Sequence, residues 1–251
     1  MAAAVRIPVV PGRRLGRPTA TSLLDAAWRR VRHPLQGAPL TAAMLLALAV
    51  TSVTLAGARP RGASIMALRA STNLHNLTSH PIEVLFVSIF WVSAPWVFWP
   101  VSALMLTVLA GAERRIGSAR TGLVFLAGHV AATLLTVTGI ALGIAQAWLP
   151  SSLTYAVDVG PSYGLAAVAA ALITGVPTRE RRWALTAALV AGLGVAVAVD
   201  QTFTDVGHLV AALIGFMLAH TAVAQRRHHR RGVRRPEAVT SCRCQATQSA
   251  R

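Results

Sequence analysis

Six long apolar runs are the feature that most limits what this chain can fold into. A helix needs about 20 apolar residues to cross a bilayer core of about 30 Å. The runs cover approximately residues 39–56, 84–110, 121–146, 161–175, 183–199 and 206–224. They predict an all-α membrane protein with six transmembrane helices. The fourth and fifth runs are short, so we expect them to occupy tightly packed interior positions.

The overall composition agrees with a membrane protein. Of the 251 residues, 54% are hydrophobic and 13% are charged, and the mean hydropathy is +0.56. These values exclude an ordinary soluble domain. The first 36 residues carry several arginines but neither the apolar core nor the small-residue cleavage site of a secretory signal. We therefore expect the N-terminus to stay in the cytoplasm.

The distribution of arginine predicts the orientation in the membrane. All 24 basic residues are arginine, and the net charge is +16. Arginines concentrate in the two tails and in segments 111–120 and 178–182, whereas segments 147–160 and 200–205 have none. The positive-inside rule then places both termini on the cytoplasmic side of the cell (inner) membrane. Loop 57–83 is the exception, because it carries three arginines on the expected outer side.

The same arginines raise the question of a nucleic-acid partner. No aromatic residues interleave with them to form a base-stacking surface, and topology already accounts for their positions. We therefore expect contact with the lipid bilayer and no nucleic-acid binding. A chain with arginine and no lysine is also what we expect of a bacterium with a high GC content.

Composition divides the chain into three parts, namely residues 1–36, 37–224 and 225–251. The first is a basic cytoplasmic segment in which 22–31 has the helical apolar spacing of an interfacial amphipathic helix. The second is the six-helix membrane domain, and the third is expected to be a basic, disordered cytoplasmic tail. The tail contains Cys242 and Cys244, for which we expect reduced, unpaired thiols because no second pair of ligands accompanies them.

Polar residues inside the predicted spans are costly and indicate where to look for function. The fourth and sixth helices both enter from the outer face, so Ser162 and His208 lie at similar depth. A serine hydroxyl needs an adjacent base to become nucleophilic at neutral pH, and the His208 imidazole is the best candidate. Asp205 precedes it by three residues on the same helical face and is placed to orient or charge it. Taken alone, the spacing of these residues favours a serine at a helix packing contact and a structural histidine over a catalytic pair.

The residues around Ser162 suit a serine exposed at a helix start. Gly160 and Gly164 let a neighbouring backbone approach closely, and Pro161 fits the first turn of a helix. Elsewhere in the spans, His129 of the third predicted helix is expected to bond a neighbouring helix. A transporter or channel has less support, because the sequence shows neither a relay of charged residues nor an inverted repeat.

Three short motifs follow one another in a characteristic order. Glu113 with the Gly-Ser pair four residues on resembles E-x-x-x-G-S, and residues 160–162 are similar to the start of G-x-S-G. His208 with Gly215 resembles the histidine and the last glycine of H-x-x-G-x-x-x-G. In this order, and over roughly residues 37–224, the chain resembles the rhomboid family of intramembrane serine proteases.

The resemblance implies a six-helix bundle in which Ser162 is the nucleophile and His208 the general base. It implies cleavage of a transmembrane protein substrate near the outer surface, with no metal and no other cofactor. The residues then expected to support the dyad are Asp205, Gly160, Tyr163, Gly164, Gly215 and Glu113.

The chain also departs from the family pattern. Tyr163 follows the serine where the motif has glycine, and Ala211 replaces the first glycine of the histidine motif. Counted back from Glu113, Val97 and Val101 stand where the family has the histidine and asparagine that support the oxyanion. Losing one such donor typically costs about 100-fold to 1,000-fold in rate.

Two hypotheses follow from these departures. In the first, the chain is a protease in which Ser102 or the backbone amide of Ser162 replaces the missing donors. In the alternative, it is a catalytically inactive relative that binds transmembrane helices as clients. The sequence leaves open whether the protein is an enzyme.

Overall fold

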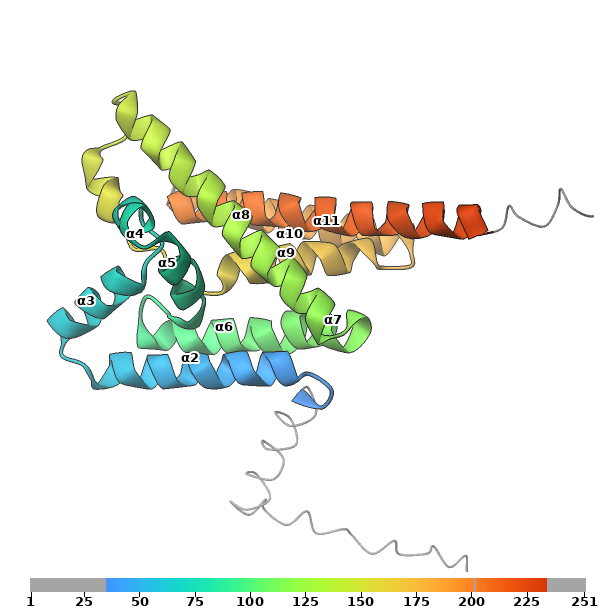
Figure 1. The fold of residues 1–251 in the computed structure, drawn as a ribbon, viewed down its shortest axis with the longest axis horizontal. Coiled ribbons are helices and arrows are strands. Elements are labelled where there is room, and N and C mark those ends of the chain that lie inside the picture. Colours follow the sequence, from blue (N-terminus) through green and yellow to red (C-terminus); the bar gives the residue numbers. More distant parts are fainter. Residues whose placement is uncertain (1–34, 201, 234–251) are drawn as a thin grey trace, which may run out of the picture.

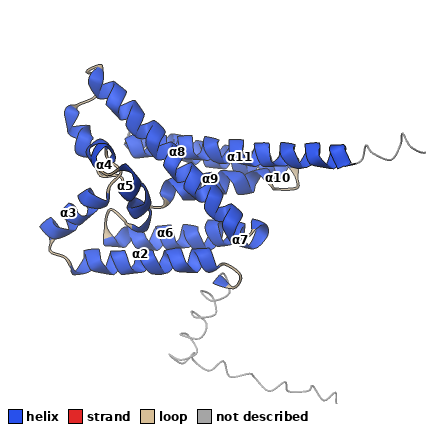
Figure 2. Cartoon of the chain, in the orientation of Figure 1, coloured by secondary structure: helices blue, strands red, loops and turns tan. Residues whose placement is uncertain are grey.

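A computed structural model describes residues 35–200 and 202–233, with side chains as far as Thr221. The predicted interfacial helix at 22–31 and the two cysteines of the tail lie outside the described residues. The described part is helical and contains no strand (Figure 2).

The helices that follow the predicted apolar runs occur in the same order in the described part (Figure 1). They are α2 (Pro39–Gly57), α6 (Phe98–Leu104), α7 (Ala110–Ile116), α8 (Ser118–Ala145), α9 (Ser162–Thr174), α10 (Arg179–Asp200) and α11 (Phe203–Val233). A π-helical turn, η3 (Met105–Leu109), joins α6 to α7. The remaining elements are α3 (Pro60–Ala70), α4 (Leu74–Ser79), α5 (Pro81–Val87), η1 (Ser88–Phe90), η2 (Pro95–Val97) and η4 (Ser151–Tyr155).

Five helical stretches of the described part are long and apolar enough to cross a membrane. They are Pro39–Gly57, Pro95–Ile116, Ser118–Ala145, Arg179–Asp200 and Phe203–Thr221. The remaining predicted span, α9, has 13 residues and is largely buried, as expected for a short interior helix. The lengths and composition of these helices indicate a multi-pass membrane protein.

The second predicted span, 84–110, was wrong in its bounds. The chain is not helical at 91–94, and the membrane-crossing stretch runs instead over Pro95–Ile116. Proline lacks the N–H that a helix interior needs, and it disfavours a helical residue before it. Ala94 is accordingly extended, with φ −152° and ψ 151°. The apolar run therefore divides into α5 with η1, and a separate span.

Two further predictions are corrected by the structure. The fifth run was expected in the interior, but α10 has 22 residues and none of them is buried. The helix begins within the arginine segment, which lengthens it beyond the apolar run. The tail was expected to be disordered from residue 225, yet α11 continues to Val233.

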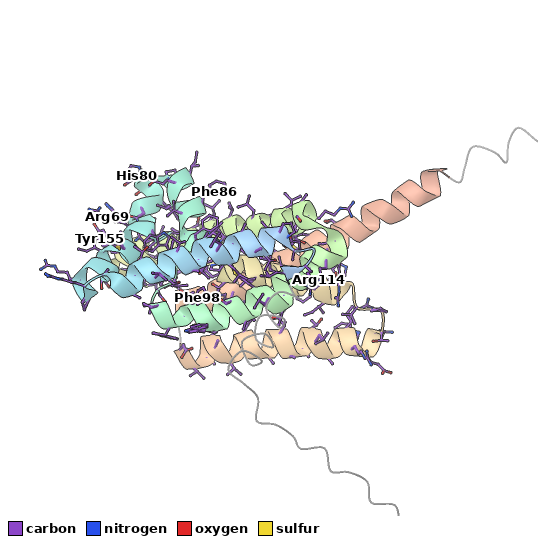
Figure 3. The ribbon with its side chains drawn as sticks, turned by 90° about the horizontal axis from the view of Figure 1, so that it is seen from below. Arg69, His80, Phe86, Phe98, Arg114 and Tyr155 are labelled. Carbon is purple, nitrogen blue, oxygen red and sulfur yellow. The ribbon has the colours of Figure 1, made fainter. Side chains whose placement is uncertain are left out.

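The helices place the short elements at one end of the molecule. Figure 1 shows α3, α4, α5 and η4 together with the first turns of α9 and α11, and we call this the Ser162 end. The junction of α7 with α8 lies at the opposite end, which we call the Glu113 end. Figure 3 shows Arg69, His80 and Tyr155 close to one another and far from Arg114.

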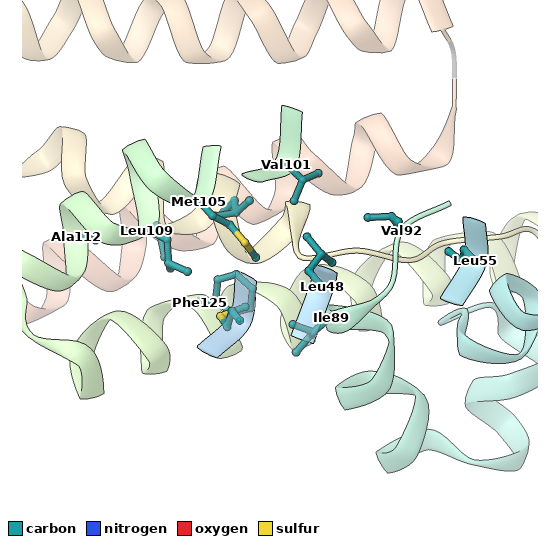
Figure 4. Close-up of a cluster of buried hydrophobic side chains, with 12 residues drawn as sticks. Leu48, Leu55, Ile89, Val92, Val101, Met105, Leu109, Ala112 and Phe125 are labelled. Atoms are coloured by element: carbon teal, nitrogen blue, oxygen red, sulfur yellow. The ribbon is translucent and has the colours of Figure 1, made fainter. Parts of the chain in front are cut away.

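Two apolar clusters hold the helices together, and α9 contributes to both. The larger one joins α2, the η1 region, α6 to α8 and α9 (Figure 4), through Met44, Leu48, Leu55, Ile89, Val92, Val101, Met105, Leu109, Ala112, Phe125, Leu165 and Val168. The smaller one joins α8, α9 and α11 through Ala132, Tyr163, Ala211 and Ile214.

Glycines allow α9 to pack closely against two neighbours. Ala167 of α9 fits against Gly128 of α8 and Gly215 of α11, and a Cβ at either glycine would collide with Ala167. The small residue at Gly215 therefore allows a close helix contact. Gly139, Gly192 and Gly194 have no such contact, because an added Cβ there would meet nothing within 4 Å.

Glu113 organises the opposite end of the bundle. Its carboxylate accepts hydrogen bonds from the backbone N–H groups of Leu40 at 2.7 Å and Thr41 at 2.9 Å. The hydroxyls of Thr41 and Ser118 also donate to it, at 2.8 and 2.6 Å. The first N–H groups of a helix lack intrahelical partners, so Glu113 caps α2 and ties it to α8. Glu113 thus supports the fold at the end away from Ser162.

Candidate active site

Ser162 is the first residue of α9 and is half-buried. Its hydroxyl makes no hydrogen bond to any residue in the described part of the chain. Gly160, two residues earlier, has φ +122°, a conformation that favours glycine. The Gly160 N–H donates to the carbonyl of Ser88 at 2.9 Å. The serine therefore follows a turn that is pinned to η1.

His208 lies in the second turn of α11 and is half-buried. Its ring meets the ring of Tyr163 edge to face, with centroids 5.1 Å apart and an interplanar angle of 75°. The fold thus brings His208 beside the residue that directly follows Ser162. No hydrogen bond joins Ser162 to His208 among the described residues. Catalytic hydrogen bonds are often long in an unliganded site and tighten when substrate binds.

Tyr163 fills the space between three helices. It is 2% exposed, and the centroid of its ring lies 6.2 Å from that of the His129 ring on α8. Its hydroxyl rests on α11 at Gly207, where an added Cβ would collide with it. The residue that departs from the glycine of the family motif is therefore a packing element that contacts both histidines.

His129 bonds a neighbouring element, as predicted. Its Nε2 lies 3.1 Å from the carbonyl oxygen of Leu85 and 3.3 Å from Oγ of Ser88. Its Nδ1 is buried without a hydrogen-bond partner in the described part. The imidazole therefore links α8 to the C-terminal end of α5 and the start of η1.

Asp158 is a site residue that sequence reasoning did not single out. It is 6% exposed, its carboxylate accepts a hydrogen bond from the Thr72 hydroxyl at 3.3 Å, and its backbone N–H donates to Oγ of Ser71 at 2.7 Å. Burial raises the pKa of the Asp158 carboxyl to about 6, although the Thr72 hydroxyl acts in the opposite direction. The Tyr163 hydroxyl faces Asp158 without reaching hydrogen-bond geometry. In the sequence, the position of Asp158 two residues before Gly160 is the signal that indicates it lies near the candidate site.

Asp205 forms a capping box at the start of α11. Its carboxylate accepts from the N–H of Thr202 at 3.3 Å and from the Thr202 hydroxyl, and its own N–H donates back to that hydroxyl at 3.3 Å. Within the described residues it makes no hydrogen bond to His208. Its role toward His208 therefore stays a prediction, while its role in capping is visible.

The family model described as rhomboid-like protein matches residues 33–228. The chain belongs to this rhomboid-like family. The match includes the whole of the predicted membrane domain, 37–224. No curated protein and no solved structure matches the chain.

In this rhomboid-like protein the second predicted span is apolar where the family resemblance expects oxyanion donors. Val101 is 9% exposed and belongs to the larger core cluster, and Val97 packs against that cluster. Ser102 beside them has a buried hydroxyl with no hydrogen-bond partner in the described part. At these two positions the chain therefore has valines that pack in the core and no side-chain hydrogen-bond donor.

The rhomboid-like protein keeps backbone donors next to the serine. No side chain caps α9, and the first N–H group seen to bond a backbone carbonyl there is that of Leu165, which donates to Pro161 at 2.9 Å. The N–H groups of Ser162, Tyr163 and Gly164 precede it and lack intrahelical partners. The positive end of the helix dipole also favours negative charge here.

Two more features complete the site. A Cβ at Gly164 would lie 2.5 Å from the Phe125 ring, so the predicted need for a small residue at this position is confirmed. In the described part, no group of three or more histidine, cysteine or acidic residues is arranged to hold a metal ion.

Proposed function

We propose that this rhomboid-like protein is an intramembrane serine protease that uses Ser162 as nucleophile and His208 as general base. The observation that carries the proposal is the ring contact of Tyr163 with His208 at 5.1 Å, because it sets the imidazole beside the start of α9. The Ser162 hydroxyl is half-buried and free of hydrogen bonds within the described part, so it is available for reaction.

The chemistry follows from these positions. His208 takes the proton of the Ser162 hydroxyl as Oγ bonds to the carbonyl carbon of a transmembrane substrate. The N–H groups at the start of α9 stabilise the oxyanion, and the imidazolium then gives its proton to the leaving amine. Water hydrolyses the acyl-enzyme by the same proton transfers. With Val97 and Val101 in place of donors, we expect slow turnover.

The location of the reaction follows from the arginine distribution. If both termini are cytoplasmic, the Ser162 end lies near the outer surface of the cell (inner) membrane. The substrate is then a transmembrane protein whose helix unwinds near that surface, and the reaction uses no metal or other cofactor.

Reaction with a fluorophosphonate probe tests the proposal. Folded, full-length protein in detergent should be labelled at Ser162, and Ser162→Ala and His208→Ala should abolish labelling and cleavage of a model transmembrane substrate. Ser64→Ala is the matched control, because the Ser64 hydroxyl only bonds its own helix α3 at Pro60 and labelling should persist. Absence of labelling in the folded wild-type protein contradicts the proposal.

The second candidate is an inactive rhomboid-like protein that binds transmembrane client helices. The apolar packing of Val97 and Val101 favours it, as does the missing hydrogen bond between Ser162 and His208 within the described residues. A photo-crosslinker at Val195, which is 61% exposed on α10, should then capture the same clients in wild type and in Ser162→Ala. Cleavage of a captured client that depends on Ser162 contradicts this candidate.

A further inference from the structure

His129 is buried in the candidate site but takes no part in the proposed dyad. It is 2% exposed, and its Nε2 lies within reach of the Leu85 carbonyl at 3.1 Å and of the Ser88 hydroxyl at 3.3 Å. A carbonyl oxygen only accepts hydrogen bonds, so Nε2 carries the ring proton. Nδ1, which has no partner in the described part, is then the unprotonated nitrogen of a neutral ring. The imidazole therefore acts as a donor toward the α5 and η1 junction.

Ser88 connects this donor to the loop that precedes the nucleophile. Ser88 is fully buried, and its backbone carbonyl oxygen accepts a hydrogen bond from the N–H of Gly160 at 2.9 Å. One residue thus contacts His129 through its side chain and Gly160 through its backbone. The contacts form a continuous path from α8, through η1, to the residue two positions before Ser162.

The conformation of Gly160 makes this path important. Its φ of +122° is rarely adopted by other residues, and glycine has many alternative conformations of similar energy. Pro161 follows with φ −78° and ψ 4°, and α9 begins at Ser162. The hydrogen bond to Ser88 directly restrains the Gly160 peptide, at the point where the chain turns into α9.

We propose that His129 and Ser88 are positioning residues that hold Gly160 and thereby aim the Ser162 hydroxyl. The consequence for catalysis rests on the proposed protease function, whereas the restraint on Gly160 does not. A displacement of about 1 Å at a reacting group can cost roughly 100-fold in rate, so a loosened Gly160 lowers the reactivity of Ser162.

Three substitutions separate the hydrogen bonds from packing. His129→Leu removes the donor, His129→Gln keeps an N–H donor near the position of Nε2, and Ser88→Ala removes the hydroxyl but keeps the carbonyl. Thr133→Val is the matched control, because Thr133 is fully buried one turn along α8 and its hydroxyl has no partner in the described part. All are compared in full-length protein whose folding is checked by size-exclusion chromatography and thermal unfolding.

Hydrogen–deuterium exchange at the Gly160 amide reports the restraint directly. We expect exchange about tenfold faster in His129→Leu and about threefold faster in Ser88→Ala, with wild-type exchange in His129→Gln and Thr133→Val. Unchanged exchange in folded His129→Leu overturns the proposal. Equal acceleration in His129→Gln overturns it too, because packing would then be responsible. If His129→Leu does not fold, the comparison of Ser88→Ala with Thr133→Val decides, and equal exchange in the two overturns the proposal.

The rate of fluorophosphonate labelling tests the catalytic consequence. The labelling rate should fall by up to about 100-fold in His129→Leu and recover in His129→Gln. If wild type is not labelled while the exchange pattern holds, the protease function fails and the positioning role of His129 and Ser88 stands. If wild type is labelled and Gly160 exchange does not respond to His129→Leu, the protease function stands and the positioning role fails.

Discussion

The central buried polar groups at the two ends of the molecule differ in their hydrogen bonds. At the Glu113 end, the carboxylate of a 2% exposed residue accepts hydrogen bonds from Leu40, Thr41 and Ser118. At the Ser162 end, the hydroxyl of Tyr163 and Nδ1 of His129 are buried without partners in the described part. A satisfied network stabilises a fold, whereas unpaired buried groups cost stability and need another reason to be present. The comparison gives the Glu113 end a structural role and favours the functional role that we propose for the Ser162 end.

Glu113→Ala should have a large effect on stability and tests the Glu113 end directly. It leaves the first N–H groups of α2 without their acceptor and should lower the free energy of unfolding by about 3 to 4 kcal/mol. Unfolding by sodium dodecyl sulfate in mixed micelles measures this value. Glu83→Ala, at an exposed glutamate of α5, is the control and should change it by less than about 0.5 kcal/mol. A loss below about 1 kcal/mol for Glu113→Ala would remove the distinction between the two ends.

The next effect is a pH dependence from Asp158. Burial raises the pKa of its carboxyl to about 6, while in the unfolded chain this pKa stays near its ordinary value of 3.8. The folded state then holds the proton more tightly, so stability falls as pH rises from about 4 to about 6 and levels off above. The pKa difference corresponds to at most about 3 kcal/mol.

Unfolding measured across this pH range checks the prediction. Asp158→Asn should flatten the dependence, whereas Asp200→Asn, at an exposed residue at the end of α10, should leave it unchanged. The same slope in wild type and Asp158→Asn would exclude this carboxyl as its source.

Gly164→Ala should have an intermediate effect. The added methyl group meets the ring of Phe125, which is itself packed in the larger core cluster, so stability should fall by about 2 kcal/mol. Gly192→Ala on α10 is the control, because its methyl group meets nothing within 4 Å. The control should gain up to about 1 kcal/mol from helix propensity. Equal effects in both variants would contradict the close contact of α9 with α8.

The smallest effect is expected from Tyr163→Phe. The variant removes a buried hydroxyl without a partner and keeps the ring against His208, so stability should change by less than about 1 kcal/mol or rise. Thermal unfolding and the fluorophosphonate rate should both stay close to wild type. Tyr163→Ala, which removes the ring as well, should cost about 3 to 5 kcal/mol. A large loss in Tyr163→Phe would mean that the hydroxyl has a partner, and the two ends would then be alike.

Part of the candidate site could be predicted from the sequence. Equal depth of two helix starts predicted that Ser162 and His208 lie near each other, and the contact of Tyr163 with His208 agrees with it. The hydrogen bonds of Asp158 and Ser88 could not be predicted, because their partners come from 41 to 87 residues away in the chain. Hydrogen bonds over such separations depend on how loops meet after the helices have packed.

The sequence by itself determined the class of protein. Apolar runs of bilayer length predict transmembrane helices, because a helix satisfies its own backbone hydrogen bonds in lipid. The family model, which matches the sequence, covers most of the chain. Local residues also determine where some helices begin. The element η2 begins at Pro95, and α11 begins directly after Thr202, which forms the capping box with Asp205.

The tertiary structure decided which residues of these helices meet. Hydropathy cannot distinguish α9, buried between α8 and α11, from α10, which has no buried residue, because lipid and a protein core are both apolar surroundings. Only the packing of α9 against its neighbours placed Tyr163 between two histidines and joined His129, through Ser88, to the turn before Ser162. These contacts depend on shape and direction, which composition and spacing do not contain.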